Sequence, residues 1–228
     1  AGVFYSGGRS RQLNFAKVDV SIPPSHQPGQ VELPNSPPPD PNKHLVLHDP
    51  ERLTGSDQFL QRLERELRSI PRESRTLLLF IHGYNTNMTE AVARFAQLVE
   101  DTGFRGVPLL FSWPSTRRTF DYVSYVNSSA ISRDALVETA TLVNQINFDS
   151  IDILAHSMGN FLAMEAFRTL ALSGRFNRLN RLSNIVLASP DIDIDLFERQ
   201  LDAIPNSERE KFVILLSRDD KALAVSRR

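Results

Sequence analysis

Residues 151–159 read Ile-Asp-Ile-Leu-Ala-His-Ser-Met-Gly, a short apolar run that stops at a serine and continues into an apolar stretch of helical character. Ser157 has Ala155 two residues before it and Gly159 two residues after it. Small residues at these positions allow a tight strand-to-helix turn that presents the serine hydroxyl to solvent. The spacing is that of a nucleophile elbow, with Ala in place of the usual first Gly. The stretch therefore predicts a nucleophilic serine at Ser157.

Apolar runs and helical patterns alternate on both sides of this turn. The sequence predicts strands at 76–82, 107–113, 151–156, 182–189 and 211–217, and helices at 56–70, 87–103, 129–146, 158–172 and 194–203. Continuous apolar strands interleaved with helices indicate a mostly parallel sheet covered on both faces. We expect this α/β core to occupy residues 51–228, with its functional site at the carboxyl ends of the strands.

The first 50 residues differ in composition from the rest of the chain. Eight of the fourteen prolines lie between Pro23 and Pro41, which predicts an extended and irregular path. Short strands are predicted on either side of this stretch, at 17–22 and 44–48. We expect residues 1–50 to form a strand and proline-rich extension packed on the core, and the alternative is a disordered tail.

Composition and charge exclude several functional classes. The net charge is -1, from 26 basic and 27 acidic residues, so no nucleic-acid partner is expected. The chain has no cysteine, which excludes thiol catalysis and cysteine-ligated metals, and we expect neither a metal nor an organic cofactor. No run reaches the ~20 apolar residues of a membrane span. A soluble protein is expected. An extracytoplasmic location is compatible with the sequence, which leaves the compartment and the oligomeric state open.

Two backbone amides are candidates for stabilising negative charge near Ser157. The strand at 76–82 ends in His82-Gly83, and the amide that follows, that of Tyr84, can point toward the space above the serine. The amide of Met158 points into the same space from the positive end of its helix. Two such donors would form an oxyanion hole. The alternative is an ordinary strand-ending turn at His82-Gly83.

A catalytic acid is expected after a later strand. Asp191, Asp219 and Asp220 all follow predicted strands, and the residues alone leave the three open. A histidine should come after the acid along the chain, but none of the five histidines follows Asp220. We expect the last strand and a histidine-bearing loop to lie in a C-terminal segment absent from this sequence, so that the chain as given would be inactive. The alternative is a natural pseudoenzyme.

Aromatic residues follow the predicted strand at 107–113. We expect Trp113 and Tyr122 to line the substrate cleft. The alternative is that these aromatic side chains only pack the loop against the sheet.

Six segments, considered jointly, carry a resemblance to a known family. They are residues 82–87 (HGYNTN), 111–115 (FSWPS), 132–136 (SRDAL), 155–160 (AHSMGN), 188–191 (ASPD) and 217–223 (SRDDKAL). Together they resemble a bacterial α/β-hydrolase family of esterase or lipase type. The resemblance implies the α/β-hydrolase fold, Ser157 as nucleophile, Asp220 as acid and the amides of Tyr84 and Met158 as oxyanion hole. It also implies a last strand and a histidine-bearing loop, which this chain lacks.

The function expected from these observations is hydrolysis of a small-molecule carboxylic ester through an acyl-enzyme on Ser157. The alternative from another class is a non-catalytic binding module that keeps the same fold and uses the proline-rich segment as a partner ligand.

Overall fold

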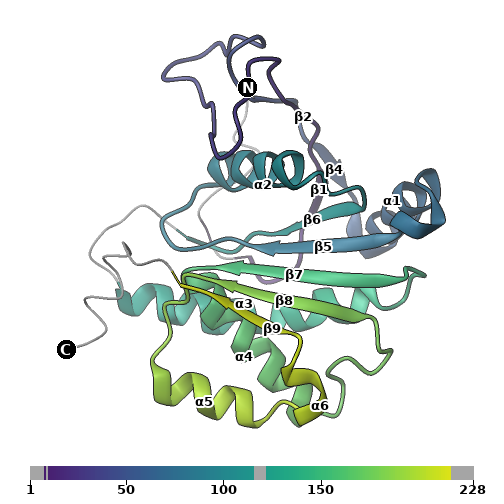
Figure 1. The fold of residues 1–228 in the computed structure, drawn as a ribbon, viewed down its shortest axis with the longest axis vertical. Helices are drawn as coiled ribbons and strands as arrows, with labels where there is room; N and C mark the ends of the chain where they lie inside the picture. The colour runs from purple at the N-terminus through teal and green to yellow at the C-terminus, as the bar shows by residue number, and fades with distance from the viewer. Residues whose placement is uncertain (1–7, 9, 116–121, 217–228) are drawn as a thin grey trace.

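The structure is a computed structural model that describes residue 8, residues 10–115 and residues 122–216, with side chains from 128 onward in the last range. Its centre is a five-stranded parallel sheet with the order β6-β5-β7-β8-β9 (Figure 1). The strands are β5 Thr76–Ile81, β6 Val107–Phe111, β7 Ser150–His156, β8 Leu182–Ala188 and β9 Phe212–Leu215. The order along the sheet therefore reverses between β5 and β7, where the two strands pair in parallel.

Helices cover both faces of this sheet. Helix α2 (Met88–Thr102) lies on one face, and α3 (Tyr122–Val143) and α4 (Met158–Leu172) lie on the other (Figure 1). Successive side chains of a strand point to opposite faces. Leu78 and Phe80 of β5 accordingly pack with Phe95 of α2, whereas Leu79 and Ile81 join the larger cluster formed with α3 and α4. The predicted parallel sheet with helices on both faces is confirmed.

The remaining elements close the ends of the core. Helix α1 (Gly55–Ser69) packs its buried face against Leu77, at the start of β5. Helix α5 (Ile194–Asp202) packs on α4, where Gln200 Nε2 donates to Glu165 Oε1 at 2.7 Å. A 3₁₀ turn at Arg72–Ser74 and the short α6 (Asn206–Arg209) complete the connections.

Helix α2 shows why its boundaries could be predicted. The Asn87 side chain accepts from the Glu90 amide at 2.9 Å, and the Asn87 amide donates to the Glu90 carboxylate at 3.2 Å. This reciprocal pair is a capping box, and Gly103 ends the helix with φ 61°. Helix α3 differs from the prediction because it begins at Tyr122 rather than at residue 129.

The N-terminal part forms two small antiparallel pairs. Strand β1 (Phe15–Lys17) pairs with β4 (Glu51–Leu53), and β2 (Val20–Ser21) pairs with β3 (Val46–Leu47). The single strand predicted at 17–22 is therefore wrong in its extent: it is split between two pairs, and β4 was not predicted. How the chain divides into domains at residue 50 stays a prediction.

A histidine joins the proline-rich segment to α2. His26 Nδ1 lies 2.9 Å from Glu32 Oε2, and His26 Nε2 lies 2.9 Å from Asp101 Oδ1. A carboxylate only accepts, so both ring nitrogens carry protons when both bonds form. The hydrogen bonds to Asp101 and then to Glu32 raise the pKa of His26. Asp101 also accepts from the Gly29 amide at 2.8 Å, which fixes this loop on the end of α2.

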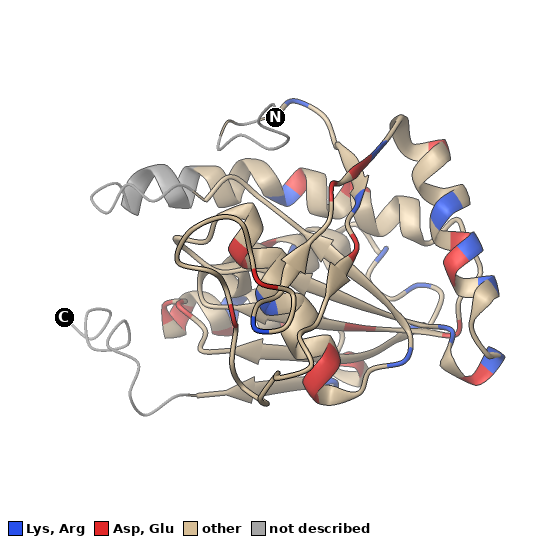
Figure 2. Ribbon diagram, turned by 90° about the horizontal axis from the view of Figure 1, so that it is seen from above, with Lys and Arg blue, Asp and Glu red and all other residues tan. Residues whose placement is uncertain are grey.

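Charged residues of both signs are interspersed over the molecule (Figure 2). Helix α1 shows this most clearly, with ion pairs between Arg62 and Glu66 at 2.9 Å and between Arg68 and Glu64 at 3.2 Å. None of the helices within the described ranges combines the length and hydropathy that crossing a bilayer requires.

Candidate active site

The candidate site lies where the strand order reverses. In open parallel sheets, ligands bind outside the carboxyl ends of the strands at such a point. Here β5 ends directly before His82-Gly83, and β7 ends at His156, directly before Ser157. The two ends are neighbours because Ile81 and Ala155 are register partners. The fold therefore brings the predicted oxyanion turn and the predicted nucleophile together.

Ser157 has a strained backbone. Its φ is 53° and its ψ is −129°, a combination that residues with a Cβ rarely adopt. The Ser157 amide donates to Ala188 O, at the end of β8, at 3.0 Å. The strain is thus held by hydrogen bonding to the next strand, and the residue stands between the end of β7 and the start of α4 as the elbow pattern predicts.

The side chain of Asn160 holds the turn at Ser157 in place by hydrogen bonds. Its side chain is fully buried, and its Nδ2 donates to Ser157 O at 2.8 Å and to Ala188 O at 2.9 Å. The Asn160 amide also donates to Ser157 O at 2.9 Å. Because both side-chain partners are carbonyl oxygens, the amide nitrogen must face them. Sequence reasoning assigned no role to this residue, although a polar side chain on an otherwise apolar helix next to the elbow is a usable signal.

Two glycines allow β5 and the elbow to approach closely. A Cβ on Gly159 would lie 2.6 Å from His82 O and 2.7 Å from Ile81 O. A Cβ on Gly83 would lie 2.7 Å from His156 Nδ1 and 2.9 Å from Ser157 Cβ. Gly83 has no positive φ, so the close approach, and not the backbone conformation, is what requires a glycine at this position. The residue of left-handed conformation in this loop is Asn85, with φ 54°.

His82 supports the loop as a buried neutral side chain. Its Nδ1 lies 2.9 Å from Gly83 O, and its Nε2 lies 3.2 Å from the Trp113 amide and 3.1 Å from Ser112 Oγ. A carbonyl only accepts and an amide only donates, which places the single ring proton on Nδ1. Burial lowers the pKa of His82 to about 4. His82 therefore acts as a fixed part of the scaffold.

Trp113 packs beneath the same loop. It is 3% exposed, its Nε1 donates to His82 O at 2.8 Å, and its ring stacks on that of His82 at 5.7 Å between centroids. Of the two sequence-based alternatives, this geometry matches packing of the loop against the sheet. Tyr122 is the first residue of α3, and its side chain lies outside the described part.

The predicted oxyanion donors are residues next in the chain to Gly83 and to Ser157. Tyr84 directly follows Gly83, and Met158 is the first residue of α4. An amide in the first turn of a helix has no acceptor within that helix. Asp191 follows β8 and is half-buried, whereas Asp219 and Asp220 lie outside the described residues. The roles of these residues stay predictions.

A second serine with positive φ directly follows the neighbouring strand, β8. Ser189 follows β8 with φ 45°, and its amide donates to Leu215 O at 2.7 Å. The next residue is Pro190, which has no amide hydrogen. This strand end therefore lacks the donor that Met158 offers after Ser157.

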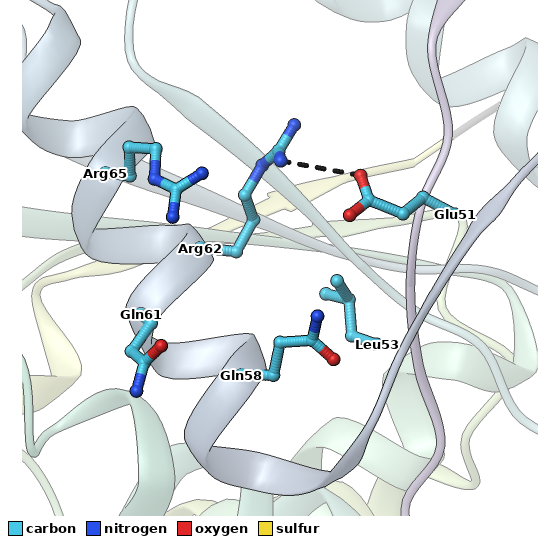
Figure 3. Close-up of a pocket in the computed structure, with 6 residues that line it drawn as sticks. All are labelled: Glu51, Leu53, Gln58, Gln61, Arg62 and Arg65. Atoms are coloured by element: carbon cyan, nitrogen blue, oxygen red, sulfur yellow. Dashed lines mark ion pairs between the residues drawn. The ribbon is translucent and has the colours of Figure 1, made fainter.

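Other polar sites on the described surface are less suited to chemistry. A small pocket at the opposite end of the core is lined by α1 and β4 residues, and Arg62 pairs there with Glu51 at 3.4 Å (Figure 3). Its volume of about 110 Å³ is below that of typical ligand pockets. Within the described residues, no group of three or more His, Asp or Glu side chains is placed to hold a metal ion.

The comparisons with known proteins agree with this fold. Residues 57–228 match the family model described as alpha/beta hydrolase of unknown function (DUF900). The chain belongs to this α/β-hydrolase family, which confirms the resemblance inferred from the motifs. No curated protein matches the sequence significantly.

Similarity to solved structures is weak. A hydrolase from Oleispira antarctica, olei00960, is 18% identical over 50% of this chain and 37% of its own, with a TM-score of 0.32. A mutant of polyneuridine aldehyde esterase is 16% identical over 58% of this chain and 49% of its own, also with a TM-score of 0.32. This chain thus covers less than half the length of either protein.

Proposed function

We propose that this protein is a serine hydrolase that cleaves carboxylic esters through an acyl-enzyme on Ser157. The observation that supports the proposal best is the backbone of Ser157, with φ 53° and ψ −129°, at the point where the strand order reverses. Strain of this kind costs about 1–3 kcal/mol and clusters at functional sites. At two glycines, Gly83 and Gly159, a Cβ would clash with neighbouring atoms, so both positions need glycine for β5 to lie this close to the serine.

The proposed reaction is acyl transfer to the serine and then to water. Ser157 Oγ attacks the acyl carbon while a histidine takes its proton, and the same proton leaves on the departing alcohol. Water then attacks the acyl-enzyme, which releases the carboxylic acid and restores the hydroxyl. Asp220 would orient the histidine. Asp220 lies outside the described residues.

The amides of Tyr84 and Met158 would hold the oxyanion of the tetrahedral intermediate. Each well-placed donor lowers the barrier by ~3 kcal/mol. Met158 is 2% exposed, so its amide would act at the edge of a dry core, where such hydrogen bonds are stronger than in water.

Steady-state hydrolysis of 4-nitrophenyl butyrate by the full-length protein tests the proposal. Ser157→Ala should lower kcat/KM by about a thousandfold or more, as loss of a nucleophile does. Ser189→Ala is the matched control, since it changes a serine of similar backbone at the next strand end, and it should leave kcat/KM within about twofold.

A parallel panel of a thioester and an anilide with the same acyl group defines the leaving-group class. A folded protein that hydrolyses none of the three compounds would contradict the proposal and favour a binding module of the same fold. Equal rates for the wild type and Ser157→Ala would exclude Ser157 as the nucleophile.

A further inference from the structure

A second cavity lies away from Ser157, between the sheet and the helices that cover one of its faces. It measures about 410 Å³, within the usual range for small-molecule sites. Its floor is formed by alternate residues of β5 and β7, namely Leu79, Ile81, Ile151 and Ile153, and its roof by α3 and α4. Neither Ser157 nor any residue of the oxyanion turn lines it.

Apart from the arginines, most of the described residues that line this cavity are apolar, and the polar ones are Thr139, Thr141, Asn144 and Asn177. Thr139 and Thr141 of α3 donate their hydroxyls to carbonyls of their own helix, at 2.8 Å to Ala135 O and 2.9 Å to Val137 O. The cavity extends from the level of Ile151 to that of Ile81, which is four residues along the paired strands. At about 3.3 Å per residue this is roughly 13 Å, the length of about ten extended methylene groups.

The rim carries positive charge at one end only. Arg175, Arg178 and Arg181 line the cavity from the loop between α4 and β8, and among the described residues that line it none is acidic. Arg181 is held in place by a hydrogen bond from Nη1 to Ile146 O at 2.8 Å and by the face of Phe148. Arg178 is exposed and forms no ion pair with the residues that the structure describes. An arginine fork suits a carboxylate.

We propose that this cavity binds an unbranched alkyl carboxylate of about ten carbons, with its chain between the sheet and α3–α4 and its head group at the three arginines. Length, apolar walls and one-sided positive charge select this amphiphile over a neutral or cationic one. The site is independent of the chemistry proposed for Ser157.

Titration calorimetry of the Ser157→Ala protein with decanoate, kept below its micellar range, tests the proposal without interference from hydrolysis. Decanoate should bind with a stoichiometry of one. Butanoate, which keeps the head group, and decyltrimethylammonium, which keeps the chain, should each bind at least about tenfold more weakly. Equal binding of the cation would overturn the role of the arginines.

Variants at the rim and in the roof locate the ligand. Arg178→Glu should weaken decanoate at least about tenfold, and Arg168→Glu, an exposed α4 arginine that does not line the cavity, should leave it unchanged. Ala140→Leu would fill the cavity from α3 and Ala166→Leu would fill it from α4. Either substitution should abolish decanoate binding. The melting curve of each variant shows whether it folds, and Ala140→Leu, at a half-buried position, remains testable if the fully buried Ala166→Leu fails. Undiminished binding to folded Arg178→Glu or Ala140→Leu, or no binding to the parent protein, would overturn the proposal.

Discussion

The ends of β7 and β8 lie side by side and look alike at first. Each strand is directly followed by a serine with positive φ, 53° at Ser157 and 45° at Ser189. The surroundings differ: Met158 is the first residue of a 15-residue helix and carries a backbone amide hydrogen, whereas Pro190 has none. A strained serine is thus not sufficient to define a candidate site. The helix start and the close approach of β5 distinguish Ser157.

The two ends also differ in what stabilises them. Ser157 is tied to Ala188 both by its own amide and through the buried Asn160 side chain, so the end of β8 supports the end of β7. The Ser189 amide donates a hydrogen bond to Leu215 O of β9. We therefore expect substitutions around Ser157 to have larger effects than comparable ones elsewhere.

The largest effect on stability is expected for Asn160→Asp. An ionised carboxylate cannot donate to Ser157 O or Ala188 O and would be buried against two acceptors. The free energy of unfolding should fall by about 3–5 kcal/mol at pH 7. Urea denaturation measures this free energy of unfolding. Asn180→Asp, at an exposed residue with φ 53°, is the matched control and should change it by less than about 0.5 kcal/mol. Similar losses for both variants would contradict the anchoring role.

Acid should destabilise the protein through His82, which directly follows β5. Its pKa is lowered from 6.5 to about 4 by burial, so the unfolded chain takes up the proton first as the pH falls. This contribution to stability is complete above pH 6.5 and decreases as the pH drops toward about 4, by about 3 kcal/mol in total.

His26 contributes with the opposite sign, because its raised pKa stabilises the folded state below pH 6.5 and this stabilisation is lost as the pH rises through the raised value. Urea titrations should therefore be made in a His26→Gln background. A ring resonance of His82 that titrates near 6.5 in the folded protein would contradict the prediction.

The next largest loss of stability is expected from a substitution at Gly159, which lies in close contact with β5. Gly159→Ala would place a Cβ 2.6 Å from His82 O and 2.7 Å from Ile81 O, and Ile81 belongs to β5, whose backbone cannot move away easily. We expect a loss of about 2 kcal/mol or more. Gly174→Ala is the comparison: its φ is 66° but no atom lies within 4 Å, so only the backbone cost of about 1 kcal/mol applies. The melting temperatures should rank in that order, and the reverse ranking would contradict the model of close approach.

The smallest expected difference in stability tests whether the backbone of Ser157 is strained. Ser157→Gly should be more stable than Ser157→Ala by about 1 kcal/mol, because glycine adopts positive φ freely. The same pair of variants at Ser189 should show a similar gain. If so, both strand ends share the strain and differ in their chemistry. Equal stability of the two Ser157 variants in urea would show that the turn is not strained.

The sequence predicted the regular core well, for reasons visible in particular elements. Helix α4 spans Met158–Leu172 as predicted, and α2 is bounded by a capping box and by Gly103. These boundaries depend on local chemistry that a sequence displays. The split of the first strand into β1 and β2 was missed, because two- and three-residue edge strands are too short to show a period.

Tertiary contacts explain what could not be predicted about the site. The closeness of Gly83 to Ser157 depends on how β5 pairs with β7, which the local sequence around Gly83 does not show. The neutral state of His82 likewise depends on burial under Trp113. The burial of Asn160 follows from the position of β8, which periodicity within α4 does not reveal.

Mapping the residue that reacts with a fluorophosphonate tests the central claim most directly. The full-length protein is incubated with the probe and digested, and the adduct is located by peptide mass spectrometry. We predict one adduct, on Ser157, which disappears in Ser157→Ala and persists in Ser189→Ala. An adduct on Ser189, or a folded protein that takes up no probe, would contradict the account.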